Sequence, residues 1–354
     1  MGFMTISARY LSRMMHGMES TRGTHLIPVL SQFKELKQFL IKSTPGVEFI
    51  EINPDEKKEH LELLKESEII IADARLICPY LYDLEKAKWI QGTWAGVDMY
   101  LNHIDKTKPK LKYTITRFSG SVSFGSQMAE YLVTHIVMRE RNFIKQHENQ
   151  LNKDWSRGGN IWTFRLLADL NIGILGFGII AKEVAQILKA FHAKVWVFVR
   201  TLPTEDSKVP FVDEYRTLNE LPELLASCDY ICNILPSTEG TIGLLGNGRL
   251  AHCSTEAGGK GAVFVNIGRG SIIPENELVE ALEKNWISGA ILDVFEKEPL
   301  PAESRLWSMP QVTITPHVSG VTRAKDVAEL FSKNFALYQS GQPLQYVFDV
   351  EKGY

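Results

Sequence analysis

The segment that most constrains the fold of this chain is a glycine-rich loop near its middle, Gly173-Ile-Leu-Gly176-Phe-Gly178-Ile-Ile-Ala181. The pattern Gly-x-Gly-x-x-Ala lies between an apolar strand, predicted over Asn171–Leu175, and a helix, predicted over Ile179–Phe191. The first glycine permits a tight turn, the second permits close approach of the backbone to a ligand, and the alanine suits helix-on-strand packing. A glycine-rich turn without a ligand is the alternative, but a helix N-terminus offers N–H groups and a positive dipole end. The loop therefore predicts a pyrophosphate site formed by Gly176, Gly178, Ile179 and Ile180.

Short apolar runs alternate with helical segments on both sides of this loop, as expected for βαβ units and parallel sheets. The 354 residues suffice for two domains. Strands are predicted over His25–Leu30, Val47–Ile52, Glu68–Ala72, Trp89–Gly92, Leu111–Ile115, Asn171–Leu175, Lys194–Val199, Asp229–Leu235, Ala262–Ile267, Gly289–Leu292 and Val312–Thr315. Helices are predicted over Ser31–Lys42, Pro54–Glu66, Ser126–Asn142, Ile179–Phe191, Leu218–Ser227 and Pro274–Asn285. The sequence thus predicts an α/β protein with doubly wound parallel sheets.

Two segments between these elements support a two-domain organisation. The helix over Ser126–Asn142 is amphipathic, with apolar Met128, Leu132, Val133, Ile136 and Val137 on one face. The polar stretch from Lys145 to Gly159 is predicted to connect the domains. A separate local signal is Pro274, which suits the first turn of the helix predicted over Pro274–Asn285, where an N–H group is not needed.

The composition of the chain excludes several classes of protein. A net charge of −3 gives no electrostatic footprint for nucleic acid or an anionic membrane surface, and no apolar run reaches the length of a transmembrane helix. The four cysteines are too few for a disulfide framework, which favours a reducing compartment. Cys228 and Cys232 lie in an apolar run without a partner at ligand spacing, so we interpret them as core residues and predict no metal site.

The N-terminal stretch Met1–Gly23 carries Arg9, Arg13 and Arg22 against the single acid Glu19. This composition is typical of a mitochondrial transit peptide, although a dispensable extension is the favoured interpretation. We therefore expect a cytoplasmic protein and keep a mitochondrial location as the alternative.

The end of the second strand after the glycine loop discriminates between nicotinamide cofactors. An NAD site places Asp or Glu there to bind the ribose 2′-hydroxyl. This strand instead ends in Arg200-Thr201. The guanidinium can pair with a 2′-phosphate and the hydroxyl can donate to it, so NADP(H) is favoured over NAD(H). A solvent-facing arginine is the alternative. Leu235 and Pro236, after the next strand, are also predicted to contact the cofactor.

Three charged side chains follow consecutive predicted strands at the edge where ligands of open α/β sheets bind. They are Arg269 in Asn266-Ile-Gly-Arg-Gly270, Glu298 in Asp293-Val-Phe-Glu-Lys-Glu-Pro299, and His317 in Thr315-Pro-His-Val-Ser-Gly320. Each alone could be an ordinary loop residue. Together they suit hydride transfer to a 2-keto acid, because the developing alkoxide needs a cation and a proton donor. An arginine fork matches the substrate carboxylate, and a carboxylate beside histidine favours imidazolium.

Further segments of the chain are distinctive: Gln91-Gly-Thr-Trp-Ala-Gly-Val-Asp98, Met128-Ala-Glu-Tyr131 and Val347-Phe-Asp-Val-Glu-Lys-Gly-Tyr354. With the glycine loop and the three strand ends, they resemble the D-isomer-specific 2-hydroxyacid dehydrogenases, and closely the glyoxylate/hydroxypyruvate reductase branch. The resemblance covers the chain from about Thr24 to Tyr354. The chain departs from the family pattern at Ala181, at Arg200 and in extra residues around Glu256–Gly261.

The resemblance implies a discontinuous flavodoxin-like substrate domain, residues 1–125 completed by 320–354, and a Rossmann cofactor domain over 126–319, with the active site in the cleft and a homodimer built through the cofactor domain. It implies that Arg269 binds the substrate carboxylate and carbonyl oxygen, that His317 donates the proton and that Glu298 pairs with it. It further implies that backbone N–H groups of Ala95, Gly96 and Val97 hold the carboxylate and that Asp293 lies near the nicotinamide carboxamide.

Other functions on this scaffold remain as alternatives. Glu298 argues against a formate dehydrogenase, in which glutamine is expected, and the chain ends too soon after His317 for a phosphoglycerate dehydrogenase with a regulatory domain. A nucleotide-sensing corepressor of the dehydrogenase fold keeps similar residues. We expect an enzyme that reduces a small 2-keto acid, and Arg75, Leu76 and Trp94 either shape its substrate pocket or serve packing.

Overall fold

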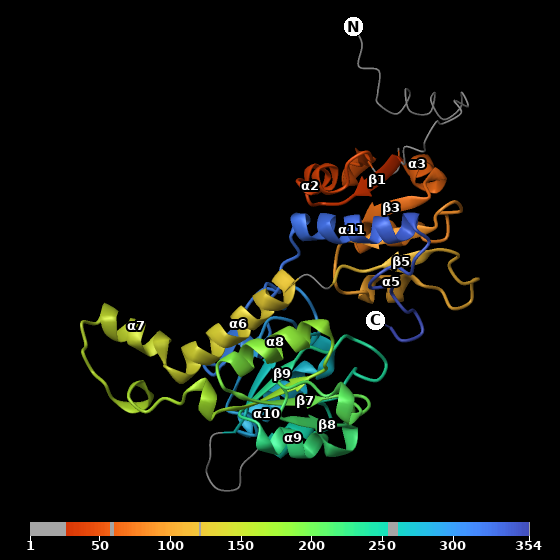
Figure 1. Cartoon of the computed structure of the whole chain (residues 1–354). Helices are drawn as coiled ribbons and strands as arrows, with labels where there is room; N and C mark the ends of the chain where they lie inside the picture. The colour runs from red at the N-terminus through yellow and green to blue at the C-terminus, as the bar shows by residue number, and fades with distance from the viewer. Residues whose placement is uncertain (1–25, 57–59, 120–121, 254–260, 354) are drawn as a thin grey trace, which may run out of the picture. The chain divides into compact units, whose positions relative to one another are not determined.

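The computed structural model describes residues 26–56, 60–119, 122–253 and 261–353. The predicted N-terminal extension and most of the insertion at 256–261 lie outside these residues. The chain divides into two compact units, one comprising Met1–Ser119 with Thr322–Tyr354 and the other Gly120–Val321. We refer to them as unit 1 and unit 2 and describe each by itself (Figure 1).

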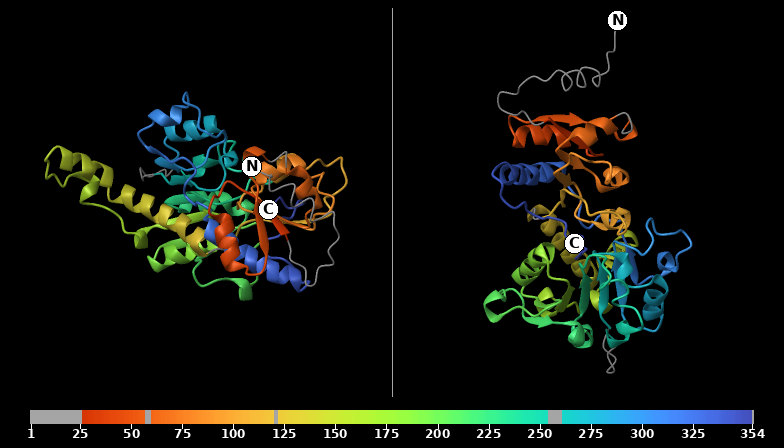
Figure 2. Two further views of the ribbon diagram at one scale, coloured as in Figure 1. Left: turned by 90° about the horizontal axis from the view of Figure 1, so that it is seen from above. Right: turned by 90° about the vertical axis from the view of Figure 1, so that its right-hand side faces the viewer.

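Unit 1 is built on a parallel sheet of five strands in the order β2-β1-β3-β4-β5. Every residue of β3 and β4 is buried, because helices and loops cover both faces of the sheet. The C-terminal helix α11 packs against α2 on one face (Figure 2). The elements are β1 (Leu26–Leu30), α2 (Leu36–Ser43), β2 (Glu48–Glu51), α3 (Leu61–Glu66), β3 (Ile69–Ala72), α4 (Ala74–Ile77), β4 (Trp89–Gly92), α5 (Asp98–His103), β5 (Thr114–Thr116) and α11 (Ala324–Gln339).

Unit 2 is built on a parallel sheet of seven strands in the order β12-β11-β10-β9-β6-β7-β8. The order reverses between β6 and β9, as in dinucleotide-binding folds. The elements are α6 (Val122–Glu140), α7 (Phe143–Leu151), β6 (Asn171–Leu175), α8 (Ile179–Ala190), β7 (Lys194–Phe198), β8 (Glu214–Arg216), α9 (Leu221–Ser227), β9 (Tyr230–Asn233), β10 (Val263–Asn266), α10 (Glu275–Glu283), β11 (Gly289–Leu292) and β12 (Val312–Ile314). The prediction of two doubly wound parallel sheets is confirmed.

Several local predictions were wrong. The segment Lys145–Gly159 is not a connection between domains: it contributes to α7 and lies wholly within unit 2. The strand predicted over Leu111–Ile115 occupies Thr114–Thr116, and Pro274 precedes α10 in extended conformation instead of lying in its first turn. Of the helix predicted over Pro54–Glu66, Pro54–Glu56 form a short 3₁₀ turn and Leu61–Glu66 form α3, while residues 57–59 lie outside the described residues. The pattern did not predict α4, α5, β8 or α11, of which the first three are too short to show a period.

The amphipathic face of α6 packs as its sequence indicates. Met128, Leu132 and Ile136 are buried in one cluster with Val184 and Leu188 of α8, so these two helices share a core on one face of the seven-stranded sheet. All four cysteines are free and buried, which confirms the interpretation of Cys228 and Cys232 as core residues. Among the described residues, no helix combines the length and the apolar character needed to cross a membrane.

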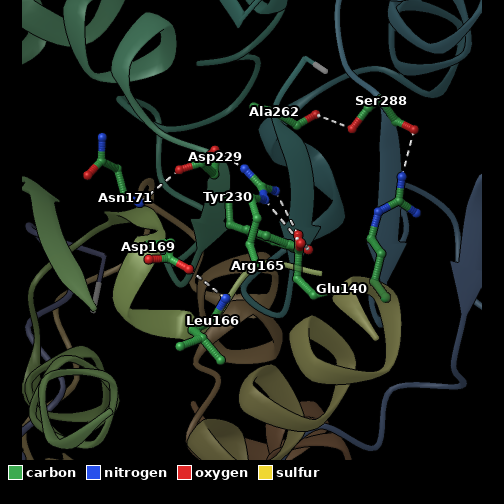
Figure 3. A network of polar contacts seen from close by, with 10 residues as sticks. Glu140, Arg165, Leu166, Asp169, Asn171, Asp229, Tyr230, Ala262 and Ser288 are labelled. Carbon is green, nitrogen blue, oxygen red and sulfur yellow. Dashed lines mark hydrogen bonds and ion pairs between the residues drawn. The ribbon is translucent and has the colours of Figure 1, made fainter. Parts of the chain in front are cut away.

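The segment after α6 projects from the body of unit 2 and returns to it at Arg165 (Figure 1). The guanidinium donates to both oxygens of Glu140, at 3.0 and 2.7 Å, and pairs with Asp229 (Figure 3). The phenol of Tyr230 also donates to Glu140, at 2.8 Å. Because Asp229 and Tyr230 lie at the start of β9, this network fastens the returning segment to the sheet at the end opposite the glycine loop.

Candidate active site

The glycine loop occupies the turn between β6 and α8, and its backbone is suited to a dinucleotide. Gly176 has φ +96°, a left-handed conformation that favours glycine, and a Cβ there would lie 2.9 Å from Leu235 Cδ2. Gly178 caps α8 in extended conformation, and a Cβ built on it meets nothing within 4 Å. Space beside a helix N-terminus is what a pyrophosphate needs, so these residues could hold one.

Side chains that would contact the adenosine half of a dinucleotide follow β7 and β9. Arg200 and Thr201 are exposed directly beyond β7, and no acidic residue lies between Phe198 and Leu202. Leu235 and Pro236 follow β9, and the Leu235 N–H donates to Asn233 Oδ1 at 3.1 Å. The absence of a carboxylate at the end of β7 leaves nothing there to repel a 2′-phosphate.

The structure brings His317 and Glu298 together, although 19 residues separate them in the sequence. Imidazole Nδ1 lies 2.8 Å from Glu298 Oε2, while Oε1 accepts the Phe295 N–H at 3.0 Å. The hydrogen bond with Glu298 raises the pKa of His317 above its ordinary value, against the opposing effects of burial and of the Arg269 charge. Burial tends to raise the pKa of Glu298, but the bonds from His317 and Phe295 outweigh it and lower the pKa. Both shifts favour the charged forms, imidazolium for His317 and carboxylate for Glu298.

Arg269 lies near this pair, as its electrostatic effect on both groups shows. It is half-buried, extended, and directly beyond β10. Two buried asparagines that the sequence reasoning missed hold its loop: Asn233 donates to Asn266 at 2.8 Å, and Asn266 donates to the Arg269 carbonyl at 3.1 Å. Each of them is the last residue of an otherwise apolar strand, a signal that could have identified them. Arg269, Glu298 and His317 thus form one cluster at the carboxyl edge of β10, β11 and β12.

Asp293 is fully buried and supports the loop that carries His317. Its carboxylate accepts hydrogen bonds from Thr315 Oγ1 at 2.6 Å and from the N–H groups of Val318 and Ser319, each at 2.8 Å. Its backbone carbonyl accepts the His317 N–H at 2.9 Å. The contact with a nicotinamide carboxamide remains a prediction.

In unit 1, Ala95, Gly96 and Val97 follow β4. Their loop is fixed by Thr93, whose hydroxyl donates to the buried Asp73 carboxylate at 2.6 Å. The Trp94 carbonyl accepts the Phe118 N–H at 3.0 Å, and the Trp94 ring packs on Phe33 with centroids 5.3 Å apart. Asp73 was not predicted from the sequence, in which it is one acid among many.

A parallel seven-stranded sheet, a glycine loop before a helix, and a histidine–carboxylate pair beside an arginine define an NAD(P)-binding oxidoreductase. Comparison with known proteins agrees. The family described as D-isomer specific 2-hydroxyacid dehydrogenase, NAD binding domain, matches residues 133–319. A D-isomer specific 2-hydroxyacid dehydrogenase family protein from Aeromonas salmonicida is 31% identical, with a TM-score of 0.79 over 93% of this chain and 100% of that one. The chain belongs to the D-isomer specific 2-hydroxyacid dehydrogenase family.

Two further solved structures are similar. The NADPH-dependent glyoxylate/hydroxypyruvate reductase from Sinorhizobium meliloti, solved with NADP and sulfate, is 26% identical with a TM-score of 0.78, over 93% of this chain and 100% of that one. A probable 2-hydroxyacid dehydrogenase from Rhizobium etli, solved with NADP, HEPES and L(+)-tartaric acid, is 26% identical with a TM-score of 0.74, over 93% of this chain and 99% of that one.

Proposed function

We propose that the protein is a glyoxylate/hydroxypyruvate-type reductase, which uses NADPH to reduce a small 2-keto acid to the D-2-hydroxy acid. The observation that carries this proposal is the His317–Glu298 pair beside Arg269, with Nδ1 and Oε2 2.8 Å apart and the pKa of His317 raised. Such a pair favours the protonated imidazole, which can donate to an alkoxide formed at the neighbouring cation.

The residues of the candidate site have different tasks in the proposed reaction. Bound nicotinamide supplies the hydride. Arg269 binds the substrate carboxylate and steadies the carbonyl oxygen as it becomes negative. Because Nδ1 of His317 is bonded to Glu298, Nε2 is the atom that gives its proton to that oxygen, leaving neutral imidazole that solvent reprotonates. The backbone N–H groups of Ala95, Gly96 and Val97 bind the carboxylate as well, which makes unit 1 the substrate domain of the proposal.

The proposed preference for NADPH rests on Arg200 and Thr201 beyond β7. Gly176, Gly178, Ile179 and Ile180 would bind the pyrophosphate, and Leu235 and Pro236 the adenosine. The relatives from Sinorhizobium meliloti and Rhizobium etli were both solved with NADP, which supports the same preference for this chain.

We also propose that the chain forms a homodimer through the projecting segment of unit 2. This segment exposes an unusual number of large apolar side chains: Ile144 at 61%, Leu151 at 69%, Trp155 at 86% and Trp162 at 66%. Large exposed apolar side chains that gather in one segment are typical of protein interfaces. Light scattering at micromolar concentration is expected to give the mass of two chains, and Trp155→Ser is expected to weaken the assembly. We also propose a cytoplasmic location. The alternative, a mitochondrial location, is tested by following a tag placed at the N-terminus.

The activity is tested by following NADPH oxidation with glyoxylate and with hydroxypyruvate. We expect turnover with at least one of them, a slower reaction with NADH, and a product of D configuration. A wild-type protein that binds NADPH tightly and oxidises it with no small 2-keto acid would instead be a nucleotide-sensing binding protein.

A further inference from the structure

The segment Met128-Ala-Glu-Tyr131 has no place in the proposed reaction, yet the structure connects it to the active-site loop. Tyr131 lies on α6, and its hydroxyl is 2.7 Å from Thr315 Oγ1. Thr315 Oγ1 in turn donates to the buried Asp293 carboxylate at 2.6 Å. Thr315 has one hydroxyl proton and gives it to Asp293, so Tyr131 must be the donor to Thr315. Burial raises the pKa of Tyr131 to about 12, and the phenol therefore keeps its proton at neutral pH.

The loop that Asp293 holds is strained at the residue proposed to donate the proton. His317 has φ +56°, a left-handed conformation that is uncommon for residues other than glycine and costs free energy. The carbonyl and carboxylate of Asp293 accept the N–H groups of three successive residues, His317, Val318 and Ser319. Asp293 therefore fixes the backbone from which the imidazole extends.

Helix α6 also holds the far end of this loop. Gln127 and the backbone of Val321 form two hydrogen bonds, of 2.9 and 3.2 Å. At Gly320 the loop approaches α6 so closely that a Cβ would lie 3.0 Å from Phe124 Cζ and 3.1 Å from Met128 Cγ. The loop from Thr315 to Val321 is thus attached to α6 at both ends, outside the His317–Glu298 contact.

We propose that Tyr131 and Thr315 are positioning residues for His317, acting through Asp293 to hold the imidazole in its contact with Glu298. The inference rests on the proposed role of His317 as proton donor. Titratable groups around the chain of bonds include His135, whose ring lies 4.3 Å from that of Tyr131 on α6, the buried thiol of Cys232 near Tyr131, and Arg269 and Glu298 at His317. Burial lowers the pKa of His135, which favours its neutral form, against the opposing effect of Asp293.

The test compares Thr315→Val with Thr315→Ser, and adds Tyr131→Phe. Valine has nearly the shape of threonine but cannot donate to Asp293, whereas serine can. The His317 ring is titrated by NMR in ¹³C-histidine-labelled full-length protein without substrate, and its signal is assigned by its loss in His317→Ala. We expect Thr315→Val and Tyr131→Phe to lower the titration midpoint toward the ordinary value of about 6.5, and Thr315→Ser to keep the wild-type midpoint.

Activity gives the second measurement. Loss of one hydrogen bond in the chain is expected to lower kcat for keto-acid reduction about two- to tenfold in Thr315→Val and in Tyr131→Phe. Unchanged His317 titration and kcat in both variants, even with a lower Tm, would overturn the proposal, because the network would then be structural only. If the wild type reduces no 2-keto acid, the proposed function fails, but the substrate-free titration still decides whether Tyr131 and Thr315 position His317.

Discussion

At the carboxyl edge of each sheet a buried aspartate holds a loop by hydrogen bonds, but the two loops have different proposed tasks. In unit 1 the buried Asp73 accepts hydrogen bonds from Ser31 Oγ, the Gln32 N–H and Thr93 Oγ1. In unit 2 the buried Asp293 accepts one hydroxyl and two N–H groups. Each carboxylate accepts three hydrogen bonds, which offset the cost of burying it and hold a loop in one conformation.

What differs is the loop that each aspartate holds. The unit 1 loop continues into Ala95, Gly96 and Val97, which bring no charge and offer backbone groups. The unit 2 loop carries His317, a titrating side chain in a strained conformation. A buried carboxylate is thus a general way to fix a loop, and the residues on that loop decide whether the edge binds or reacts. Each of the following predictions tests one side of this contrast.

The largest effect is expected from His317→Ala, which removes the titrating group from unit 2. Turnover should fall about 10²–10⁴-fold, the usual contribution of a positioned acid. NADPH affinity should change little, since Gly176, Gly178 and Arg200 are intact. Steady-state kinetics measure turnover, and a fluorescence titration measures NADPH affinity. The control is His252→Ala, which changes an exposed histidine. Near-normal turnover would refute the assignment of His317.

A smaller effect is expected from Arg200→Asp. This variant alters the proposed cofactor preference of unit 2 and leaves the proposed proton donor intact. Loss of a charge-assisted bond to the 2′-phosphate should weaken NADPH binding about ten- to a hundredfold and improve the relative use of NADH. Lys194→Asp, with the same charge change at the other end of β7, serves as control. Equal Michaelis constants for NADPH and NADH in the wild type would contradict the preference.

The matched change in unit 1 is Thr93→Val, which removes the hydroxyl bond to Asp73 just as Thr315→Val removes the one to Asp293. Because the unit 1 loop is proposed to bind the carboxylate only, the KM for the keto acid should rise about two- to tenfold while kcat is largely kept. Thr93→Ser should behave as wild type. If Thr93→Val lowered kcat and left KM unchanged, the division of tasks between the two edges would be wrong.

The smallest overall effect is expected from Glu298→Gln, which changes mainly the pH dependence of turnover. Reduction uses imidazolium, so activity falls as pH rises through the pKa of His317, which the bond to Glu298 raises. Glutamine keeps a partner but not its charge, so this fall should move to lower pH, with less than about a fivefold loss on the acidic side. Oxidation of the hydroxy acid uses neutral imidazole, so its rise with pH should move in the same direction. A pH profile identical to that of the wild type would remove the role given to Glu298.

Much of the fold could be predicted because its signals are local. Apolar runs such as Ile69–Ala72 and Gly289–Leu292 are strands buried on both faces, and the periodicity of α8 is clear within its own twelve residues. The predictions failed where local pattern and structure diverge. Lys145–Gly159 is polar like a linker, but it begins within helix α7 and lies wholly in unit 2. Helix α4 has only four residues and carries no period to detect.

The residues of the candidate site also divide into those that the sequence identified and those that it did not. Arg269, Glu298 and His317 could be selected because each follows a strand whose carboxyl end lies at one edge of the sheet. The hydrogen-bonding roles of Asp73, Tyr131 and Thr315 could not be predicted, because they depend on partners outside their own segments. Their partners are far away in the chain: Ser31 and Asp73 are 42 positions apart, and Tyr131 and Thr315 are 184 positions apart.

The sequence by itself determined the alternation of strands and helices, the glycine loop, the missing acid beyond β7 and the charged residues at the strand ends. These follow from side-chain period, backbone freedom and charge, which short segments carry within themselves. Only the tertiary structure decided which buried carboxylates hold the loops, that His317 meets Glu298 at 2.8 Å, and that its backbone is left-handed. Hydrogen bonds of buried polar groups depend on which distant residues folding brings to one place, and that information lies in no single segment.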